Sequence, residues 1–186
     1  MNWIDTPLLV YSLSEGHPAR ERVTEALSRG QWASSILVLL EVYQVLAIDY
    51  AITRDVAAAQ VGALLNSPIQ WSGADVSQAA TVTRYRYQFG LGGADAALLV
   101  LCTEDEGVLH TLDARLLRVA REQGLAVSTL VDRTVAERVH EWEEQHLPPR
   151  GLPRLLRSMY LWIGQQDPRV AERFIESTKN LTRLPV

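Results

Sequence analysis

Two acidic residues interrupt segments that are otherwise apolar. Glu41 lies within Ile-Leu-Val-Leu-Leu-Glu-Val-Tyr-Gln-Val-Leu, and Asp95 lies within Gly-Gly-Ala-Asp-Ala-Ala-Leu-Leu-Val-Leu. A charge that is buried without a partner costs several kcal/mol. Glu41 is too far into its predicted helix to cap it, and no arginine falls within either segment. Both positions therefore need a cationic partner from elsewhere, either a metal ion or an arginine distant in the sequence.

Two further acidic residues end predicted strands. Asp5 follows the apolar start of the chain, and Asp113 follows the segment 108–112. The carboxyl ends of parallel strands share one edge of a sheet, so these two residues are expected to meet Glu41 and Asp95 there. A cluster made only of carboxylates selects hard ions such as Mg²⁺ or Mn²⁺, which assist phosphodiester chemistry. Helix capping by Asp5, Asp95 or Asp113 is the structural alternative.

Hydroxyl and guanidinium groups accompany these acids in the sequence. Thr6 and Thr111 stand beside them, and Thr111 shares the strand side of Asp113, where it could hold a metal-bound water. Three arginines are candidates for contacting substrate phosphates: Arg115, Arg84 and Arg86. Arg115 is the strongest of the three because it lies two residues past Asp113. A solvated helix face is the alternative reading for all of them.

The elements that must position these residues alternate along the chain. Short apolar strands are predicted at 2–5, 31–34, 69–72, 108–112 and 125–130, with helices between them. This pattern is typical of an α/β fold, a three-layer α/β/α sandwich around a central parallel sheet of about five strands. We expect residues 1–130 to form this domain. Residues 131–186 are expected to form a C-terminal extension, with helices at 131–145, 155–162 and 170–177.

Composition excludes several classes of protein. The 186 residues carry 18 basic and 22 acidic side chains, for a net charge of −4. Residues 1–146 hold 11 basic and 19 acidic groups, whereas residues 147–186 hold 7 and 3, so an acidic body precedes a basic tail. An acidic body argues against nonspecific coating of nucleic acid. One cysteine, Cys102, excludes an internal disulfide framework, and no segment has the roughly 20 apolar residues of a membrane span. A cytoplasmic location is predicted.

Four motifs in series resemble those of the PIN-domain nucleases. They are Asp-Thr-Pro-Leu-Leu-Val-Tyr at 5–11, Ser-Ser-Ile-Leu-Val-Leu-Leu-Glu-Val at 34–42, Gly-Gly-Ala-Asp-Ala-Ala at 92–97 and Leu-His-Thr-Leu-Asp-Ala-Arg-Leu at 109–116. Each motif is weak alone, but the four occur in the family's order and approximate spacing. The match covers about residues 1–130. Many small bacterial members of the family are VapC-type toxins of type II toxin–antitoxin pairs, which this chain resembles.

The resemblance implies a PIN-like fold and metal-dependent cleavage of RNA. It assigns Mg²⁺ or Mn²⁺ to four carboxylates, those of Asp5, Glu41, Asp95 and Asp113. It also implies an RNA substrate, an antitoxin protein as partner and a homodimer. On this reading the chain is a metal-dependent endoribonuclease, the toxin component of a type II pair.

Two departures from the family pattern define an alternative function. Pro7 stands where the family commonly has asparagine, and Leu116 and Leu117 occupy a region that often carries a further acid. A catalytically weak or inactive PIN-like module that binds RNA or protein would tolerate both changes. A receiver-like or phosphatase-like protein also gathers acids at strand ends. It is disfavoured because no lysine follows the last strand and Pro7 replaces a second acid.

The C-terminal extension is the part that the resemblance explains least. It could be a helical lid that packs on the sheet domain. Alternatively, Arg150, Arg154 and Arg157 could contact RNA backbone or a partner protein. Structural packing is the favoured interpretation.

Overall fold

The computed structural model describes residues 1–147 and 154–178. In this part of the chain, five short strands form one fully parallel sheet. Their order is β3 (Gln70–Ser72), β2 (Trp32–Ser35), β1 (Asn2–Ile4), β4 (Val108–His110) and β5 (Ala126–Ser128). From β1 in the centre, β2 and β3 follow on one side, and β4 and β5 follow on the other side. The topological switch point, where ligands bind in such sheets, therefore lies between β1 and β4.

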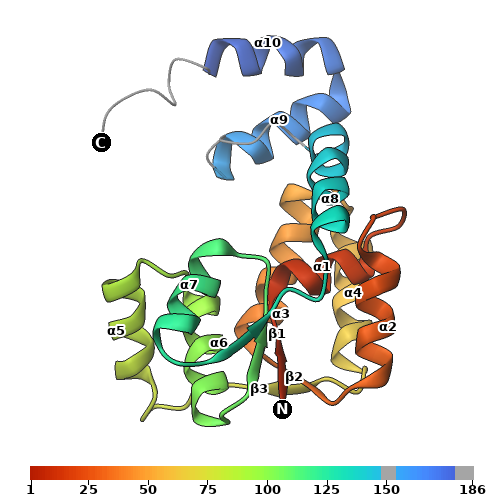
Figure 1. Ribbon diagram of the computed structural model, residues 1–186. Helices are drawn as coiled ribbons and strands as arrows, with labels where there is room; N and C mark the ends of the chain where they lie inside the picture. Colours follow the sequence, from red (N-terminus) through yellow and green to blue (C-terminus); the bar gives the residue numbers. More distant parts are fainter. Residues whose placement is uncertain (148–153, 179–186) are drawn as a thin grey trace.

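Helices cover both faces of the sheet, which confirms the predicted three-layer fold. Figure 1 shows α5, α6 and α7 on one side of the strands and α1, α2 and α4 on the other. The bounds are α1 (Thr6–Leu13), α2 (Arg20–Arg29), α3 (Ile36–Gln44), α4 (Arg54–Leu65), α5 (Ala79–Phe89), α6 (Gly93–Glu104) and α7 (Ala114–Glu122). Trp3 and Ile4 are consecutive in β1 and both buried, as expected for a parallel strand covered on both faces.

Helix α3 is only partly buried, although its sequence is almost entirely apolar. Val38 and Val42 are fully buried, but Ile36, Leu37 and Leu40 are 38%, 38% and 56% exposed. Helix α3 packs against α1, α4 and α6, and these contacts leave the three side chains partly uncovered. A π-helical turn, η1 (Val45–Asp49), continues α3.

Three helices follow the last strand, as predicted. They are α8 (Arg133–His146), α9 (Arg154–Gln166) and α10 (Pro168–Thr178), and they extend away from the sheet (Figure 1). Helix α9 packs against α10 and η1. Arg150 lies outside the described residues, so the structure leaves its predicted role untested. No helix within residues 1–147 and 154–178 is long and apolar enough to cross a membrane.

Gly107 permits the close approach of β1 and the loop before β4. A Cβ atom at this position would lie 2.4 Å from Trp3 Cδ1 and 2.9 Å from the Met1 carbonyl oxygen. We expect Gly107→Ala to lower the free energy of unfolding by about 1–3 kcal/mol through overpacking, as measured by urea denaturation. Gly62→Ala is the control, because nothing lies within 4 Å of that helical site and alanine there should stabilise the protein slightly. Unchanged stability of Gly107→Ala would contradict the packing described.

Candidate active site

Asp5 stands at the junction of β1 and α1, at the centre of the sheet. Its carboxylate caps α1 by accepting a hydrogen bond from the Thr6 backbone N–H at 2.7 Å. Its own backbone N–H donates to the His110 carbonyl at 3.1 Å, which extends the pairing of β1 with β4. The side chain is only 1% exposed. Asp5 therefore carries a carboxylate into the interior at the switch point of the sheet.

Asp113 occupies the equivalent position on the neighbouring strand. It follows β4 and caps α7, where its Oδ1 accepts from the Leu116 backbone N–H at 2.7 Å. Thr111 links the two strand ends. Its hydroxyl donates to Asp5 Oδ2 at 2.5 Å and accepts from the Asp113 backbone N–H at 3.0 Å. Strand β4 ends at His110, so Thr111 and Asp113 do not share a strand side as predicted; they meet through this hydrogen bond instead.

Asp95 reaches the same place from the first turn of α6. Its Oδ2 accepts from the Gly92 backbone N–H at 3.1 Å, which fixes the side chain over the start of the helix. The adjoining loop turns at Gly90, whose φ of +63° favours glycine. Arg115 donates to the Gly90 carbonyl at 2.6 Å and thereby ties this loop to α7. Asp95 therefore caps the start of α6, as the structural alternative held, and it also lines the cavity.

Glu41 reaches the cavity from another element, helix α3. Its Oε2 accepts a hydrogen bond from the Thr6 hydroxyl at 2.8 Å. Thr6 thus orients two acids, one through its backbone N–H and one through its side chain. Glu41 is half-buried, because it lies at the border of the exposed face of α3.

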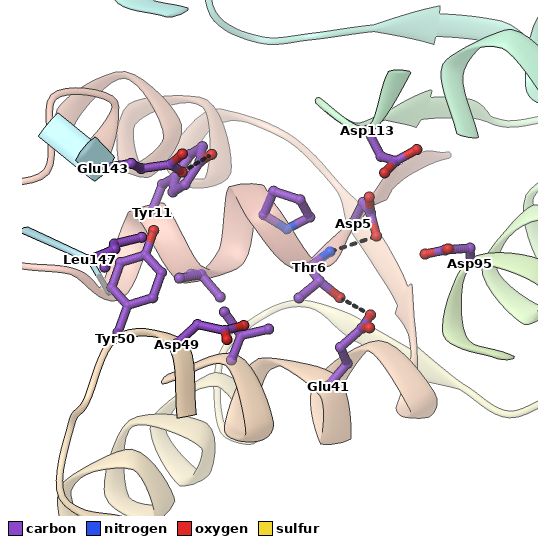
Figure 2. A pocket seen from close by; sticks show the side chains of 13 residues that line it. Asp5, Thr6, Tyr11, Glu41, Asp49, Tyr50, Asp95, Asp113, Glu143 and Leu147 are labelled. Carbon is purple, nitrogen blue, oxygen red and sulfur yellow. Dashed lines mark hydrogen bonds between the residues drawn. The ribbon is translucent and has the colours of Figure 1, made fainter. Parts of the chain in front are cut away.

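The four acids line one cavity of about 330 Å³ at the carboxyl edge of the sheet. Figure 2 shows Asp5 in the middle, with Asp113, Asp95 and Glu41 around it. None of the described residues that line this cavity is basic. Other lining side chains come from α1, η1 and α8, namely Pro7, Val10, Tyr11, Val45, Asp49, Tyr50, Glu143 and Leu147. Of these, only Pro7 was considered a site feature in the sequence.

Burial and mutual repulsion dominate the electrostatics. The pKa of Asp5 is raised from 3.8 to about 7: burial is the largest cause, the charges of Asp95 and Glu41 contribute to the rise, and the hydrogen bonds from Thr111 and Thr6 oppose it. Burial also raises the pKa of Asp95, with the charge of Glu41 as the next cause. Negative charge is therefore concentrated here, in a place where the described side chains leave it largely uncompensated.

The donor set fits a hard divalent cation. The cavity offers carboxylate oxygens from five chain segments and no nitrogen or sulfur ligand from the described lining. Within residues 1–147 and 154–178, however, no three carboxylates lie close enough together to enclose an ion directly. Mg²⁺ retains several waters and is commonly held by one or two carboxylates, so this spacing suits an ion bound partly through water.

The predicted phosphate-binding arginines lie outside the cavity. Arg115 is the nearest, since its charge lowers the pKa of Asp95, but its guanidinium is engaged with Gly90. Arg84 lies over the Tyr85 ring at 5.6 Å, and Arg86 is exposed on α5. The structure therefore gives Arg115 a local positioning contact and leaves all three phosphate-binding roles untested.

Thr111 offers a direct test of the described hydrogen bonding. Because its hydroxyl donates to Asp5, Thr111→Val should raise the pKa of Asp5 by about one further unit. The measurement is a carboxyl ¹³C NMR titration in the presence of a chelator. Thr111→Ser retains the hydroxyl and should titrate like the wild type. An unchanged Asp5 titration in Thr111→Val would show that the hydroxyl does not act on this carboxylate.

A parallel α/β/α sandwich with an acidic cavity at its switch point defines the class of protein. Residues 3–122 match the family model described as the PIN domain, which is more than half of the chain. The chain therefore belongs to the PIN domain family, as its motifs indicated. No curated protein sequence matches it.

Solved structures of toxins share this fold. The crystal structure of Mycobacterium tuberculosis VapC20, described as a sarcin–ricin loop cleaving toxin, is similar with a TM-score of 0.56 and 11% identity. That similarity covers 64% of this chain and 95% of the other. VapBC2 from Rickettsia felis, solved with a DNA fragment from the promoter, matches with a TM-score of 0.51 and 13% identity, over 68% and 96%. The predicted resemblance to VapC toxins is confirmed at the level of the fold.

Proposed function

We propose that this protein is a metal-dependent ribonuclease that hydrolyses RNA phosphodiester bonds at the acidic cavity, with Mg²⁺ or Mn²⁺ as cofactor. The observation that supports this most is the convergence of Asp5, Glu41, Asp95 and Asp113 on one cavity from four separate segments. Membership of the PIN domain family supports nuclease activity independently. When bound, a divalent ion lowers the pKa of its bound water and stabilises charge on the phosphate.

The roles of the residues follow from their positions. Asp5 is the most buried acid and is held by Thr6 and Thr111, so it acts as the fixed ligand of the ion. Asp113 is exposed at the mouth, where an incoming phosphate arrives. Glu41 and Asp95 both lie beside Asp5 (Figure 2), and one of them orients or deprotonates the attacking water. The chain needs no covalent nucleophile for this reaction.

We further propose that the protein is the toxin of a type II toxin–antitoxin pair and that an antitoxin protein blocks it. Support comes from the fold shared with VapC20, which is described as a toxin, and with the VapBC2 complex. A homodimer and a cytoplasmic location stay predictions. Expression of this chain alone should arrest bacterial growth, and co-expression of a small protein encoded beside it should restore growth.

An inactive binding module is the second candidate. It is favoured by the absence, within the described residues, of three acids close enough to enclose an ion. Pro7 lines the cavity without a backbone N–H to donate, and Leu116 is fully buried in the core where the family often has a further acid nearby. RNA binding without Mn²⁺ binding, measured by calorimetry, would favour this candidate over the ribonuclease.

The deciding experiment measures cleavage of single-stranded RNA by the purified chain. We expect cleavage with Mn²⁺, none with a chelator, and little cleavage of DNA of the same sequence. An Asp95→Asn preparation purified in the same way reports any contaminating nuclease. RNA cleavage that persists in the chelator, or equals that of the variant preparation, would contradict the proposed function.

A further inference from the structure

Basic side chains are concentrated on two helices beside the acidic cavity. Helices α5 and α7 together carry five arginines and one acid, whereas residues 1–146 as a whole hold 11 basic and 19 acidic groups. The arginines are Arg84, Arg86, Arg115, Arg118 and Arg121, and the acid is Glu122. All six side chains are exposed. We call the exposed surface that these five arginines form the arginine face.

Two side-chain hydrogen bonds connect α5 with α7. Arg115 Nη1 donates to the carbonyl of Gly90, the residue that directly follows α5, at 2.6 Å. The Tyr85 hydroxyl donates to Oε1 of Gln123, the residue that directly follows α7, at 3.2 Å. Figure 1 shows both helices on the same side of the strands. The arginines of α5 and α7 therefore belong to one part of the molecular surface.

The arginine face begins at the acidic cavity. Asp113 lines the cavity and caps α7, so α7 leads away from the cavity with Arg115 in its first turn. The charge of Arg115 lowers the pKa of Asp95, which lines the same cavity. Arg118 and Arg121 follow at intervals of three residues, each about 4.5 Å farther along the helix. A polyanion whose backbone crosses the cavity on this side would meet arginine side chains as it leaves.

The guanidinium groups of the arginine face are not neutralised by acids. None of its five arginines forms an ion pair with another residue of the described segments 1–147 and 154–178. Arg29 and Arg133, by comparison, each pair with a glutamate four residues away on their own helix. Arginine binds phosphate through charge-assisted and often bidentate hydrogen bonds. The arginine face can therefore offer charge to a ligand without first breaking an ion pair.

Tyr87 adds an exposed aromatic ring to this surface. Its side chain is 94% exposed, whereas the other two aromatic residues of α5, Tyr85 and Phe89, pack against each other with ring centroids 5.4 Å apart. Tyr87 directly follows Arg86 and lies about one turn past Arg84. Proteins that bind single-stranded nucleic acid combine cations along the backbone with aromatic rings on which bases stack. An acidic protein segment would use the cations but would have no use for the ring.

We propose that the arginine face binds the single-stranded RNA that flanks the scissile bond, with its arginines on backbone phosphates and Tyr87 stacked on a base. This proposal rests on the proposed ribonuclease function for the identity of the polyanion. The described lining of the cavity has no basic side chain, so the substrate's other phosphates need cations from outside it. Binding of RNA and cleavage of its backbone are thereby assigned to adjacent parts of the molecule.

Binding of a fluorescent single-stranded RNA to the metal-free protein, followed by anisotropy over a range of salt concentrations, tests the arginines without cleavage. Each phosphate contact contributes about 0.7 to the slope of log affinity against log salt. Arg86→Gln and Arg118→Gln should each weaken binding and reduce the slope by about that amount. Arg54→Gln is the matched control, because Arg54 is exposed on α4, across the sheet, and should match the wild type. Unchanged slopes in both α5 and α7 variants would overturn the proposal.

Substitution of Tyr87 decides between RNA and an acidic protein segment as the ligand. Tyr87→Ala should weaken RNA binding about 10-fold, through the loss of one stacked base, and leave the salt slope unchanged. Tyr87→Phe keeps the ring and should bind like the wild type. Poly-glutamate of the same net charge as the RNA stands in for an acidic segment and should bind more weakly than the RNA. Equal binding of the two polyanions, or RNA binding that Tyr87→Ala does not change, would overturn RNA as the ligand.

The use of a chelator separates this proposal from the proposed function. If the wild type binds RNA through these residues but cuts none with Mn²⁺, the ribonuclease proposal fails and the arginine face stands. If RNA is cut with Mn²⁺ while Arg86→Gln, Arg118→Gln and Tyr87→Ala all bind it like the wild type, the arginine face is overturned and the ribonuclease stands.

Discussion

Asp95→Asn should reduce Mn²⁺-supported RNA cleavage by at least about 10²-fold while leaving the fold unchanged. Asparagine retains a side-chain acceptor for the Gly92 backbone N–H, so the loop and the start of α6 keep their hydrogen bond. What is lost is one of the six acidic groups that line the cavity. Since burial and Glu41 raise the pKa of Asp95, removing that charge should not destabilise the protein. Initial rates on a fluorescent RNA substrate measure the effect.

A capping aspartate away from the cavity supplies the control. Asp132 caps α8, where its side chain accepts from the Val135 backbone N–H at 2.9 Å, and asparagine can do the same. Asp132→Asn should therefore cleave RNA like the wild type. Glu41→Gln should lose activity to a similar extent as Asp95→Asn. Full activity in either Asp95→Asn or Glu41→Gln would show that the substituted carboxylate is not needed for cleavage.

Asp5→Asn should stabilise the metal-free protein at pH 8. The pKa of Asp5 rises from 3.8 to about 7 on folding, so the folded protein binds this proton more tightly than the unfolded chain. Wild-type stability therefore falls as the pH rises from about 4 to about 7, where the folded protein gives up the proton. The variant has no proton to lose. The stability difference at pH 8 should reach about 4 kcal/mol, which corresponds to about 10 °C in melting temperature.

The pH dependence of this gain makes it specific. Thermal unfolding of Asp5→Asn and wild type in a chelator should converge as the pH falls below 3.8, because Asp5 is then mostly protonated in both the folded and the unfolded wild type. Glu15→Gln alters an exposed acid and should change stability little at any pH. A constant difference between Asp5→Asn and wild type across this range would show that burial does not perturb Asp5.

Local sequence patterns were sufficient to predict that the four acids would gather at one edge of the sheet. Asp5 and Asp113 directly follow strands, and adjacent parallel strands bring such residues together whatever the details of packing. Asp95 follows a glycine loop at the start of a buried helix, so its position was also determined locally. Glu41 could be recognised because an acid within so apolar a segment required an explanation.

The lining contributed by Asp49 and Glu143 could not be predicted, because these residues reach the cavity only through tertiary packing. Glu143 belongs to a helix with many glutamates, and nothing local distinguishes it from its exposed neighbours. Asp49 depends on the π-helical turn, which apolar periodicity does not reveal. The spacing from Glu41 through Val45 to Asp49 was the one available signal, and it gains meaning only once α3 is known to border the cavity.

The exposed face of α3 shows the limit of composition as a guide to burial. The segment that forms α3 is apolar apart from Glu41 and Gln44, yet Leu40 is 56% exposed. An apolar helix face gains free energy from burial, but the sequence of the helix does not identify the element that packs on it. In the same way, the sequence placed Arg84 and Arg86 on a helix but did not show whether their side chains face the cavity.

Calorimetric titration of the purified protein with Mn²⁺ tests most directly whether four distant carboxylates form one cation site. The wild type should bind Mn²⁺, and Asp5→Asn and Asp95→Asn should each bind it at least about 10-fold more weakly. Asp132→Asn, which alters an acid outside the cavity, should match the wild type. Failure of the wild type to bind Mn²⁺, or equal affinity in the wild type and both cavity variants, would contradict the assignment of this cavity as a metal site.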